Sequence, residues 1–348
     1  MTGLRFFAAV VVFFEHVRML PGLESFEMIG GYGGMGVSVF FVLSGFIIAH
    51  NYLGTEKQPS SWRGTGNFYL SRFSKIYPLH LLFLLIALPL AFQSSTSPLN
   101  PSYLPQFITL ADRISPWGFL AMGDPPNKLA WTLSCEIFFY LLTPLLFAVI
   151  AKLGKRQFAI LSAFILAFGL LQVFIYHTDF LKISPSALYA TGPFRLLDYL
   201  VGIALLIVLR GKKSPGNAAF LSGIVYLVMV RLFEQHLESY LPRHLTYLPG
   251  AALLIFGCPN TTGWLRKLLT NRISILLGNA SFALYISHEI ILRYARYGFS
   301  QLDIRFDPIT GVIVILIAFA GLQFLSIGLF RYYELPVQKW LRSKLRLR

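Results

Sequence analysis

The feature that most limits how this chain can fold is a series of apolar segments, repeated from one end to the other, each long enough to cross a bilayer. The hydrocarbon core of a membrane takes about 20 apolar residues as helix, within a range of about 17–25. Hydrophobic residues make up 55% of the 348 residues. Charged residues make up only 13%, about half the share found in soluble domains. These values exclude a disordered chain, a coiled coil and a soluble disulfide scaffold, and they predict an all-α polytopic membrane protein.

The apolar segments predict ten transmembrane helices. The eighth is short, and its Pro249-Gly250 pair indicates a bent or tilted element. The connection Gln93–Lys128 is predicted to lie on the outer face, with an interfacial stretch near Leu104–Met122. The ten predicted spans are Leu4–Leu20, Gly31–Ala49, Ile76–Phe92, Leu129–Ala151, Phe158–Tyr176, Phe194–Leu209, Ala218–Phe233, Tyr247–Cys258, Ile273–Tyr294 and Pro308–Phe330.

The distribution of charge predicts the orientation of these spans. With both termini in the cytoplasm, 20 of the 30 Lys and Arg residues lie on the inner side, with only Glu56 and Glu334 of the 15 acidic residues. A version in which Leu104–Met122 crosses the membrane would move most of the later basic residues outside, against the positive-inside rule. The net charge of +15 is therefore assigned to membrane orientation, and no nucleic-acid partner is expected. We expect a single integral domain, residues 1–348, in the inner (plasma) membrane, in contact with membrane lipid.

Three polar residues in the outer parts of the predicted spans are candidates for catalysis: His16, Glu136 and His288. A charge at mid-membrane costs at least about 2.5–3.5 kcal/mol, so each such residue is a functional hypothesis. At about 1.5 Å per residue, all three are predicted within roughly 10 Å of the outer boundary. Two imidazoles and a carboxylate at one depth can form a general-base site in which the carboxylate orients a histidine. The alternative, that these side chains only join helices by hydrogen bonds, stays open.

A metal site is not expected, because the sequence has no HxxxH or paired-carboxylate spacing. Cys135 and Cys258 both lie in apolar runs and are predicted to be buried thiols. No permanently bound cofactor is expected.

Basic residues at the predicted inner ends of spans one and three indicate a phosphate site. Arg72 and Lys75 are spaced i, i+3 and project from one helical face, and Arg5 opens the first span. Such cations can bind phosphate groups, although Lys and Arg at inner helix ends are also expected from topology alone. The cluster Gly30–Gly36 is interpreted as a helix-packing device that can also line the acceptor entrance.

Six motifs, in chain order, resemble acyltransferase family 3, the bacterial membrane enzymes that O-acetylate polysaccharides and other surface glycans. They are Arg5 with His16 eleven residues later, Gly36–Phe46, Arg72–Pro78, Trp131–Tyr140, Ser281–His288 and Glu334–Pro336. The resemblance covers the whole chain, without the extracytoplasmic domain that some members append. Ile137 and Phe138 depart from the acid and Gln that many members carry there, a form more similar to the exopolysaccharide acetyltransferases.

The resemblance implies an acyl-CoA donor, usually acetyl-CoA, reached from the cytoplasm, and a carbohydrate or lipid-linked glycan as acceptor. It implies that His16 is the general base, with Glu136 or His288 orienting it. A transporter or flippase without acyl-transfer chemistry is the alternative. The motifs also imply supporting roles for Ser44, Trp131, Ser134, Tyr140, Ser281 and Tyr285.

Overall fold

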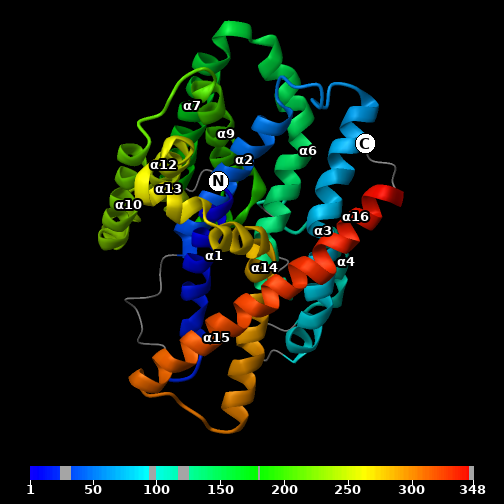
Figure 1. Cartoon of the computed structure of the whole chain (residues 1–348), viewed down its shortest axis with the longest axis vertical. Helices are drawn as coiled ribbons and strands as arrows, with labels where there is room; N and C mark the ends of the chain where they lie inside the picture. Colours follow the sequence, from blue (N-terminus) through cyan, green and yellow to red (C-terminus); the bar gives the residue numbers. More distant parts are fainter. Residues whose placement is uncertain (24–32, 94–98, 117–124, 179–180, 345–348) are drawn as a thin grey trace.

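The computed structural model describes residues 1–23, 33–93, 99–116, 125–178 and 181–344, and within these ranges it is helical without strands. Each predicted span coincides with a described helix of at least 15 residues (Figure 1). These helices are α1 Thr2–His16, α2 Gly33–Tyr52, α3 Trp62–Phe92, α6 Trp131–Lys152, α7 Gln157–Thr178, α9 Gly192–Leu209, α10 Asn217–Leu232, α12 Arg243–Gly257, α14 Arg272–Gln301 and α15 Pro308–Leu329.

Shorter elements join the long helices. The 3-10 turns are η1 Val17–Met19, η2 Pro101–Tyr103, η3 Lys128–Ala130, η4 Gly154–Arg156 and η5 Cys258–Asn260, and the π-helix is η6 Phe330–Glu334. The short α-helices are α4 Leu104–Thr109, α8 Pro185–Ala190, α11 Glu234–Leu237, α13 Gly263–Thr270 and α16 Leu335–Lys344. Three predictions fall partly outside the described residues. They concern residues 30–32 of the glycine cluster, residues 117–122 of the interfacial stretch, and Arg346 and Arg348 of the basic tail.

Seven helical segments of the described chain are long and apolar enough to cross a membrane: those that contain α2, α3, α6, α7, α9, α14 and α15. The helices α1, α10 and α12 have only 15 or 16 residues each. The structure therefore supports a multi-pass membrane protein, while the count of ten spans and the cytoplasmic ends remain predictions.

The third span differs from its prediction at the N-terminal end. The sequence analysis placed its start near Ile76, but α3 begins at Trp62, because the Ser61 side chain caps it by accepting a hydrogen bond from the N–H of Gly64. Arg72 and Lys75 consequently lie inside this helix, and their predicted i, i+3 spacing on one helical face holds.

The centre of the molecule is α2, which packs against α1, α9 and α12. A Cβ atom at Gly45 would lie 2.0 Å from the carbonyl oxygen of Tyr199, and one at Gly202 would lie 2.0 Å from that of Val42. Side chains at these positions would force α2 and α9 apart. Of the glycine cluster interpreted as a packing device, Gly36 is also in close contact, since a Cβ there would lie 2.6 Å from the carbonyl oxygen of Ala8 in α1.

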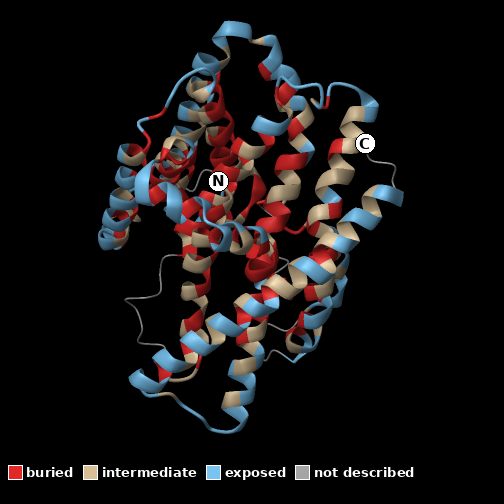
Figure 2. Ribbon diagram, viewed as in Figure 1, coloured by how far each residue is buried: buried red, intermediate tan, exposed pale blue. Residues whose placement is uncertain are grey.

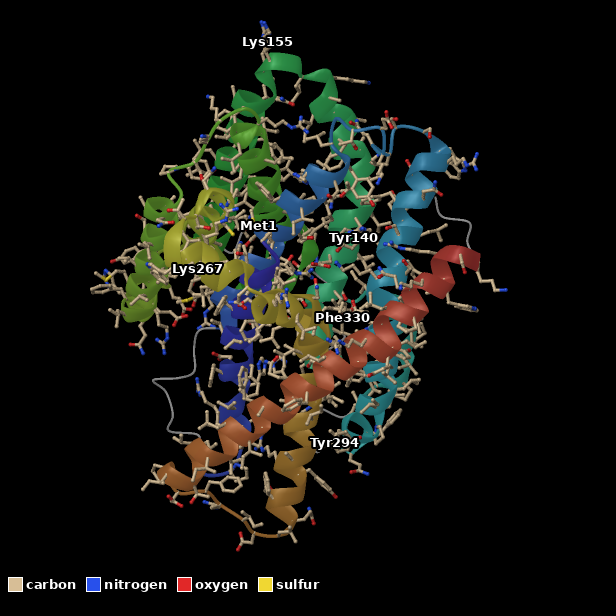
Figure 3. The ribbon with its side chains drawn as sticks, in the orientation of Figure 1. Met1, Tyr140, Lys155, Lys267, Tyr294 and Phe330 are labelled. Atoms are coloured by element: carbon tan, nitrogen blue, oxygen red, sulfur yellow. The ribbon has the colours of Figure 1, made fainter. Side chains whose placement is uncertain are left out.

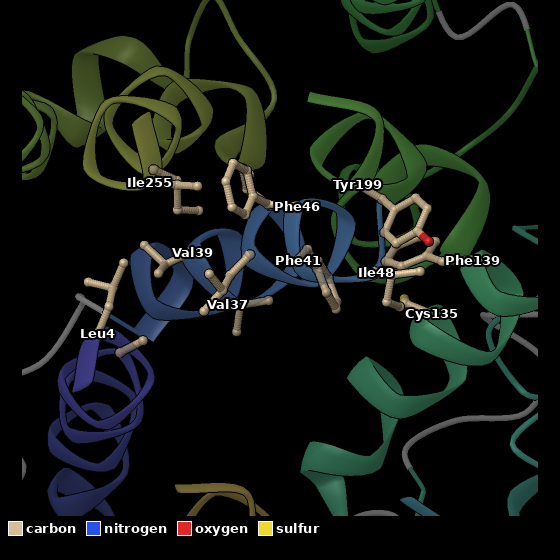
Figure 4. Close-up of a cluster of buried hydrophobic side chains, with 14 of the residues drawn as sticks. Leu4, Val37, Val39, Phe41, Phe46, Ile48, Cys135, Phe139, Tyr199 and Ile255 are labelled. Carbon is tan, nitrogen blue, oxygen red and sulfur yellow. The ribbon is translucent and has the colours of Figure 1, made fainter. Parts of the chain in front are cut away.

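Aromatic rings fill the space beside α2. Phe41 meets Phe139 edge to face, with ring centroids 5.2 Å apart, and Phe139 stacks on Tyr199 at 5.1 Å. The three rings join α2, α6 and α9 (Figure 4). Both cysteines are free and buried, as predicted.

The helices α7, α10 and α15 have many exposed residues (Figure 2), and large apolar side chains are among them. Leu166 is 65% exposed and Phe324 is 77% exposed. A soluble monomer rarely exposes so large an apolar surface, and lipid is the solvent that suits it.

Candidate active site

Two histidines from distant parts of the sequence lie in contact. His16 is the last residue of α1, and His288 is a fully buried residue of α14, a helix that packs along α1. His288 Nε2 lies 3.3 Å from His16 Nδ1, and the ring centroids are 5.1 Å apart. The spacing argument placed both at one depth, and the structure brings them together.

The hydrogen bonds of the pair determine where the protons lie. His16 Nδ1 is 2.9 Å from the Val12 carbonyl oxygen, and His288 Nδ1 is 2.9 Å from that of Leu284. A carbonyl oxygen only accepts, so each Nδ1 carries the hydrogen and donates it. His288 Nε2 then holds a lone pair and accepts from His16 Nδ1–H. This assignment leaves the Nε2 lone pair of His16 available as a base.

A cavity on the other side of Tyr285 gathers the predicted donor-site residues. Its polar lining includes Arg5, Arg72 and Lys75, together with Glu136 from α6. Tyr285 lines this cavity, and its ring centroid is 6.2 Å from that of His288. Tyr285 therefore stands between the cation-lined cavity and the histidine pair. Ser44 and Tyr140 line the same cavity.

The position of Glu136 corrects one expectation. Glu136 was one of two candidates, with His288, for the residue that orients His16, but its Oε2 accepts a hydrogen bond of 2.6 Å from Tyr140 OH inside the cavity. The acidic group faces the cations because α6 turns it toward α3. The residue that contacts His16 is His288.

A second carboxylate belongs to this charged site. Glu334 lies in the π-helix η6, is 5% exposed, and is close enough to Lys75 and Arg5 to interact with both electrostatically. Its place in a resembled motif was the only sequence signal for it. Lys75 is also within the field of Arg5, Arg72 and Glu136. Three cations face two carboxylates, so the described site has an excess of positive charge.

Two of the predicted supporting residues act at the edge of the site. Ser134 Oγ donates to Asp112 Oδ1 at 2.6 Å, and Asp112 Oδ2 pairs with Arg113 Nε at 3.0 Å. Burial raises the pKa of the Asp112 carboxyl, an effect that Arg113 and Ser134 oppose. This contact holds the outer connection against α6, two residues before Glu136. Trp131, at the start of α6, packs with its ring centroid 5.4 Å from that of Tyr189, and the two rings are tilted to each other.

The hydroxyl group of Ser281 forms a hydrogen bond within its own helix. Its Oγ donates to the Gly278 carbonyl at 2.8 Å, within α14 and away from both histidines. Gly278 allows a close contact with α1, since a Cβ there would lie 2.1 Å from the Thr2 carbonyl oxygen. This region of α14 fixes the first turn of α1 and hence Arg5.

One buried ion pair was missed by the sequence analysis. Arg195 and Asp198 are both fully buried in α9, with Arg195 Nη2 3.1 Å from Asp198 Oδ1 and 3.0 Å from Ser38 Oγ. The Arg195 guanidinium lies 4.9 Å from the ring of Phe41, a cavity residue. Both charges lie inside the predicted span Phe194–Leu209, so the rule used for His16 would have found them.

Comparison with known proteins identifies the family of the chain. A family model described as an acyltransferase domain matches residues 1–330. The chain belongs to acyltransferase family 3. It is an acyltransferase enzyme, and this membership decides against the transporter or flippase alternative.

Three relatives show the range of this family. The acyltransferase MdmB of Streptomyces mycarofaciens is 30% identical, over 84% of this chain and 79% of that protein. The peptidoglycan O-acetyltransferase OatA of Listeria monocytogenes is 25% identical, over 97% of this chain and 55% of its own length. The putative peptidoglycan O-acetyltransferase YrhL of Bacillus subtilis is 24% identical, over 83% and 48%. The chain spans about half the length of the last two. No solved structure matches it.

Proposed function

We propose that this family 3 enzyme moves an acetyl group from cytoplasmic acetyl-CoA to a hydroxyl group of a cell-surface or exported glycan, with His16 as general base. The observation that carries the proposal is the Nε2 lone pair of His16, which has no hydrogen-bond partner among the described residues. His16 lies on a helix that begins beside the cations of the cavity. Two relatives are named as peptidoglycan O-acetyltransferases, which supports a glycan acceptor. The departure at Ile137 and Phe138 favours an exopolysaccharide.

The donor would occupy the cavity with its phosphates against Arg5, Arg72 and Lys75. Arg5 and His16 lie eleven residues apart on α1, about 16 Å along the helix axis. An extended pantetheine arm is long enough to cover much of this distance. The arm would pass the layer of Tyr285 and carry the thioester toward the histidine pair.

The reaction needs a base because a sugar hydroxyl is a poor nucleophile at neutral pH. His16 Nε2 takes the hydroxyl proton as the oxygen attacks the thioester carbonyl carbon. The C–O bond forms, the C–S bond breaks, and the imidazolium returns its proton to the departing thiolate. While His16 is charged, its Nδ1–H remains bonded to Val12 O and His288 Nε2. General-base catalysis of this kind contributes about 10²–10⁴-fold.

The test is acetyl transfer by the purified protein in lipid nanodiscs, with labelled acetyl-CoA and isolated glycan. We expect His16→Ala to lose at least about a hundredfold in turnover while still binding CoA. Replacement of the exposed His50 by Gln is the matched control and should change neither quantity. A His16→Gln enzyme with near wild-type turnover would remove the base from the mechanism. Mass spectrometry of glycans from cells with and without the gene identifies the acceptor.

A further inference from the structure

Two arginines far apart in the sequence lie within hydrogen-bond distance of one hydroxyl group. Arg72 of α3 and Arg342 of α16 each place Nη2 3.3 Å from Ser71 Oγ. The two nitrogen atoms therefore cannot be more than twice that distance apart. Figure 1 shows α16 running beside α3, and the two helices pack together. Arg342 lies outside every motif that the sequence analysis used.

The turn before α16 brings Arg342 to this position. Pro336 has no N–H for the carbonyl of Tyr332, so the α-helical pattern is interrupted and widens into the π-helix η6. Such π segments are frequent at functional sites. The Tyr333 hydroxyl then donates to the Pro78 carbonyl at 3.2 Å, which fixes the start of α16 against α3.

The two guanidinium groups have unused donors. The Nε atoms of Arg72 and Arg342 are buried without a hydrogen-bond partner among the described residues. None of the ion pairs found in the described ranges involves either arginine. Two like charges held at this distance repel each other unless an anion lies between them. Paired guanidinium groups with free N–H donors match the oxygens of a phosphate.

The order of the cations along α3 indicates which phosphate group of coenzyme A would lie at each of them. Lys75 lies three residues beyond Arg72 on α3, about 4.5 Å farther along the helix axis. Lys75 interacts electrostatically with Arg5 and Glu136. Arg342 is near Arg72, at the other end of this short row of cations. In coenzyme A the diphosphate adjoins the pantetheine arm, and the 3′-phosphate lies beyond it on the ribose. An arm that runs toward His16 places the diphosphate at Lys75 and the 3′-phosphate farther out.

We propose that Arg342, together with Arg72, binds the 3′-phosphate of the coenzyme A part of the donor. The inference rests on the proposed function, because it assumes an acyl-CoA donor. A phosphate on an anionic lipid headgroup has the same chemistry, so the experiment must separate the two sources.

The test measures binding of CoA and of 3′-dephospho-CoA to the full-length protein, by calorimetry in nanodiscs of zwitterionic lipid. Wild type should bind CoA about tenfold or more tightly than dephospho-CoA, which lacks only the 3′-phosphate. Arg342→Gln should lose most of this preference and bind dephospho-CoA as wild type does. Arg342→Lys, which keeps the charge without the planar fork, should keep part of the preference. Lys339→Gln removes an exposed cation of the same helix and should keep all of it.

The outcomes separate the inference from the proposed function. A wild type that binds neither ligand would overturn the acyl-CoA donor and this inference together. An Arg342→Gln protein that keeps the preference for CoA would overturn only the role of Arg342. If Arg342 instead binds lipid, anionic nanodiscs will raise the melting temperature of wild type but not of Arg342→Gln, while CoA binding stays equal, and this result also contradicts the inference.

Discussion

At the residue scale, the proposed chemistry depends on which nitrogen of His16 carries the hydrogen. Val12 and Leu284 each supply the carbonyl oxygen four residues before a histidine, so backbone geometry alone sets both Nδ1 atoms as donors. As the partner of His16, His288 differs from a carboxylate, because its Nε2 accepts the hydrogen bond from His16 Nδ1–H without adding a negative charge. We infer that it is a positioning residue, and that the proton from the acceptor is held by His16 alone.

A substitution of His288 tests this positioning role. His288→Phe removes the acceptor for His16 Nδ1–H and should lower kcat about tenfold, the size of one hydrogen bond to a charged group. The donor KM should stay unchanged, because the cation cavity lies on the other side of Tyr285. His288→Gln keeps an acceptor oxygen and should recover part of the loss. Steady-state kinetics with varied donor measures both quantities; a change confined to the donor KM contradicts the assignment.

At the element scale, glycine contacts set the positions of the helices that carry the site. Gly278 lets α14 touch the first turn of α1, and Gly36 lets α2 approach it, with a Cβ there only 2.6 Å from the Ala8 carbonyl oxygen. The α2–α9 pair uses Gly45 and Gly202 in the same way. These contacts fix α1 between its neighbours. They therefore fix the positions of Arg5 at one end of α1 and His16 at the other relative to the surrounding helices.

The substitution Gly45→Ala tests the α2–α9 contact. Its new methyl group would meet the Tyr199 carbonyl at 2.0 Å, and the overpacking should destabilise the protein by about 1–3 kcal/mol. Gly328→Ala in α15 is the control, because no atom lies within 4 Å of its added Cβ. Thermal unfolding in detergent should show a lower midpoint for Gly45→Ala alone. Equal midpoints for the two variants would mean that α2 and α9 can separate without cost.

At the scale of the whole molecule, the cation cavity and the histidine pair occupy successive levels along the bundle. Lys155 lies at one end of its long axis, and Tyr294 lies in the other half of the molecule (Figure 3). This separation agrees with the predicted topology, in which Lys155 is cytoplasmic and Tyr294 is near the outer face. A donor from one side and an acceptor from the other could then meet inside the protein without either crossing the membrane.

Cysteine labelling tests this topology. The native Cys135 and Cys258 are buried and should give little background. In intact cells, an impermeant maleimide should label Ser102→Cys and Asp303→Cys but not Lys212→Cys; all three positions are exposed. Permeabilised cells should label all three. If Lys212→Cys and Ser102→Cys react alike in intact cells, the ten-span arrangement is wrong.

The class of the protein and the positions of its long helices follow from the amino-acid sequence alone. Long apolar segments can satisfy their backbone in lipid only as helices, so the ten predicted spans coincide with the ten long described helices. The sequence also predicted His16 and His288 as candidates, because a polar group in an apolar segment is costly and therefore conspicuous. Arg5, Arg72 and Lys75 were predicted from their places at the inner ends of two spans, and their roles stay predictions.

Which of these residues meet depends on the packing of the helices in three dimensions. The depth of a residue follows from counting along one helix, whereas the face it presents depends on how neighbouring helices rotate and pack. Glu136 was therefore expected beside His16 but lies with Tyr140 among the cations. Arg342 is one of several cations in a basic tail, and a π-helical turn that no local sequence pattern indicated places it near Arg72. Contacts between helices remote in sequence leave no periodic signal in either one, and for this reason the partners in the site could be found only in three dimensions.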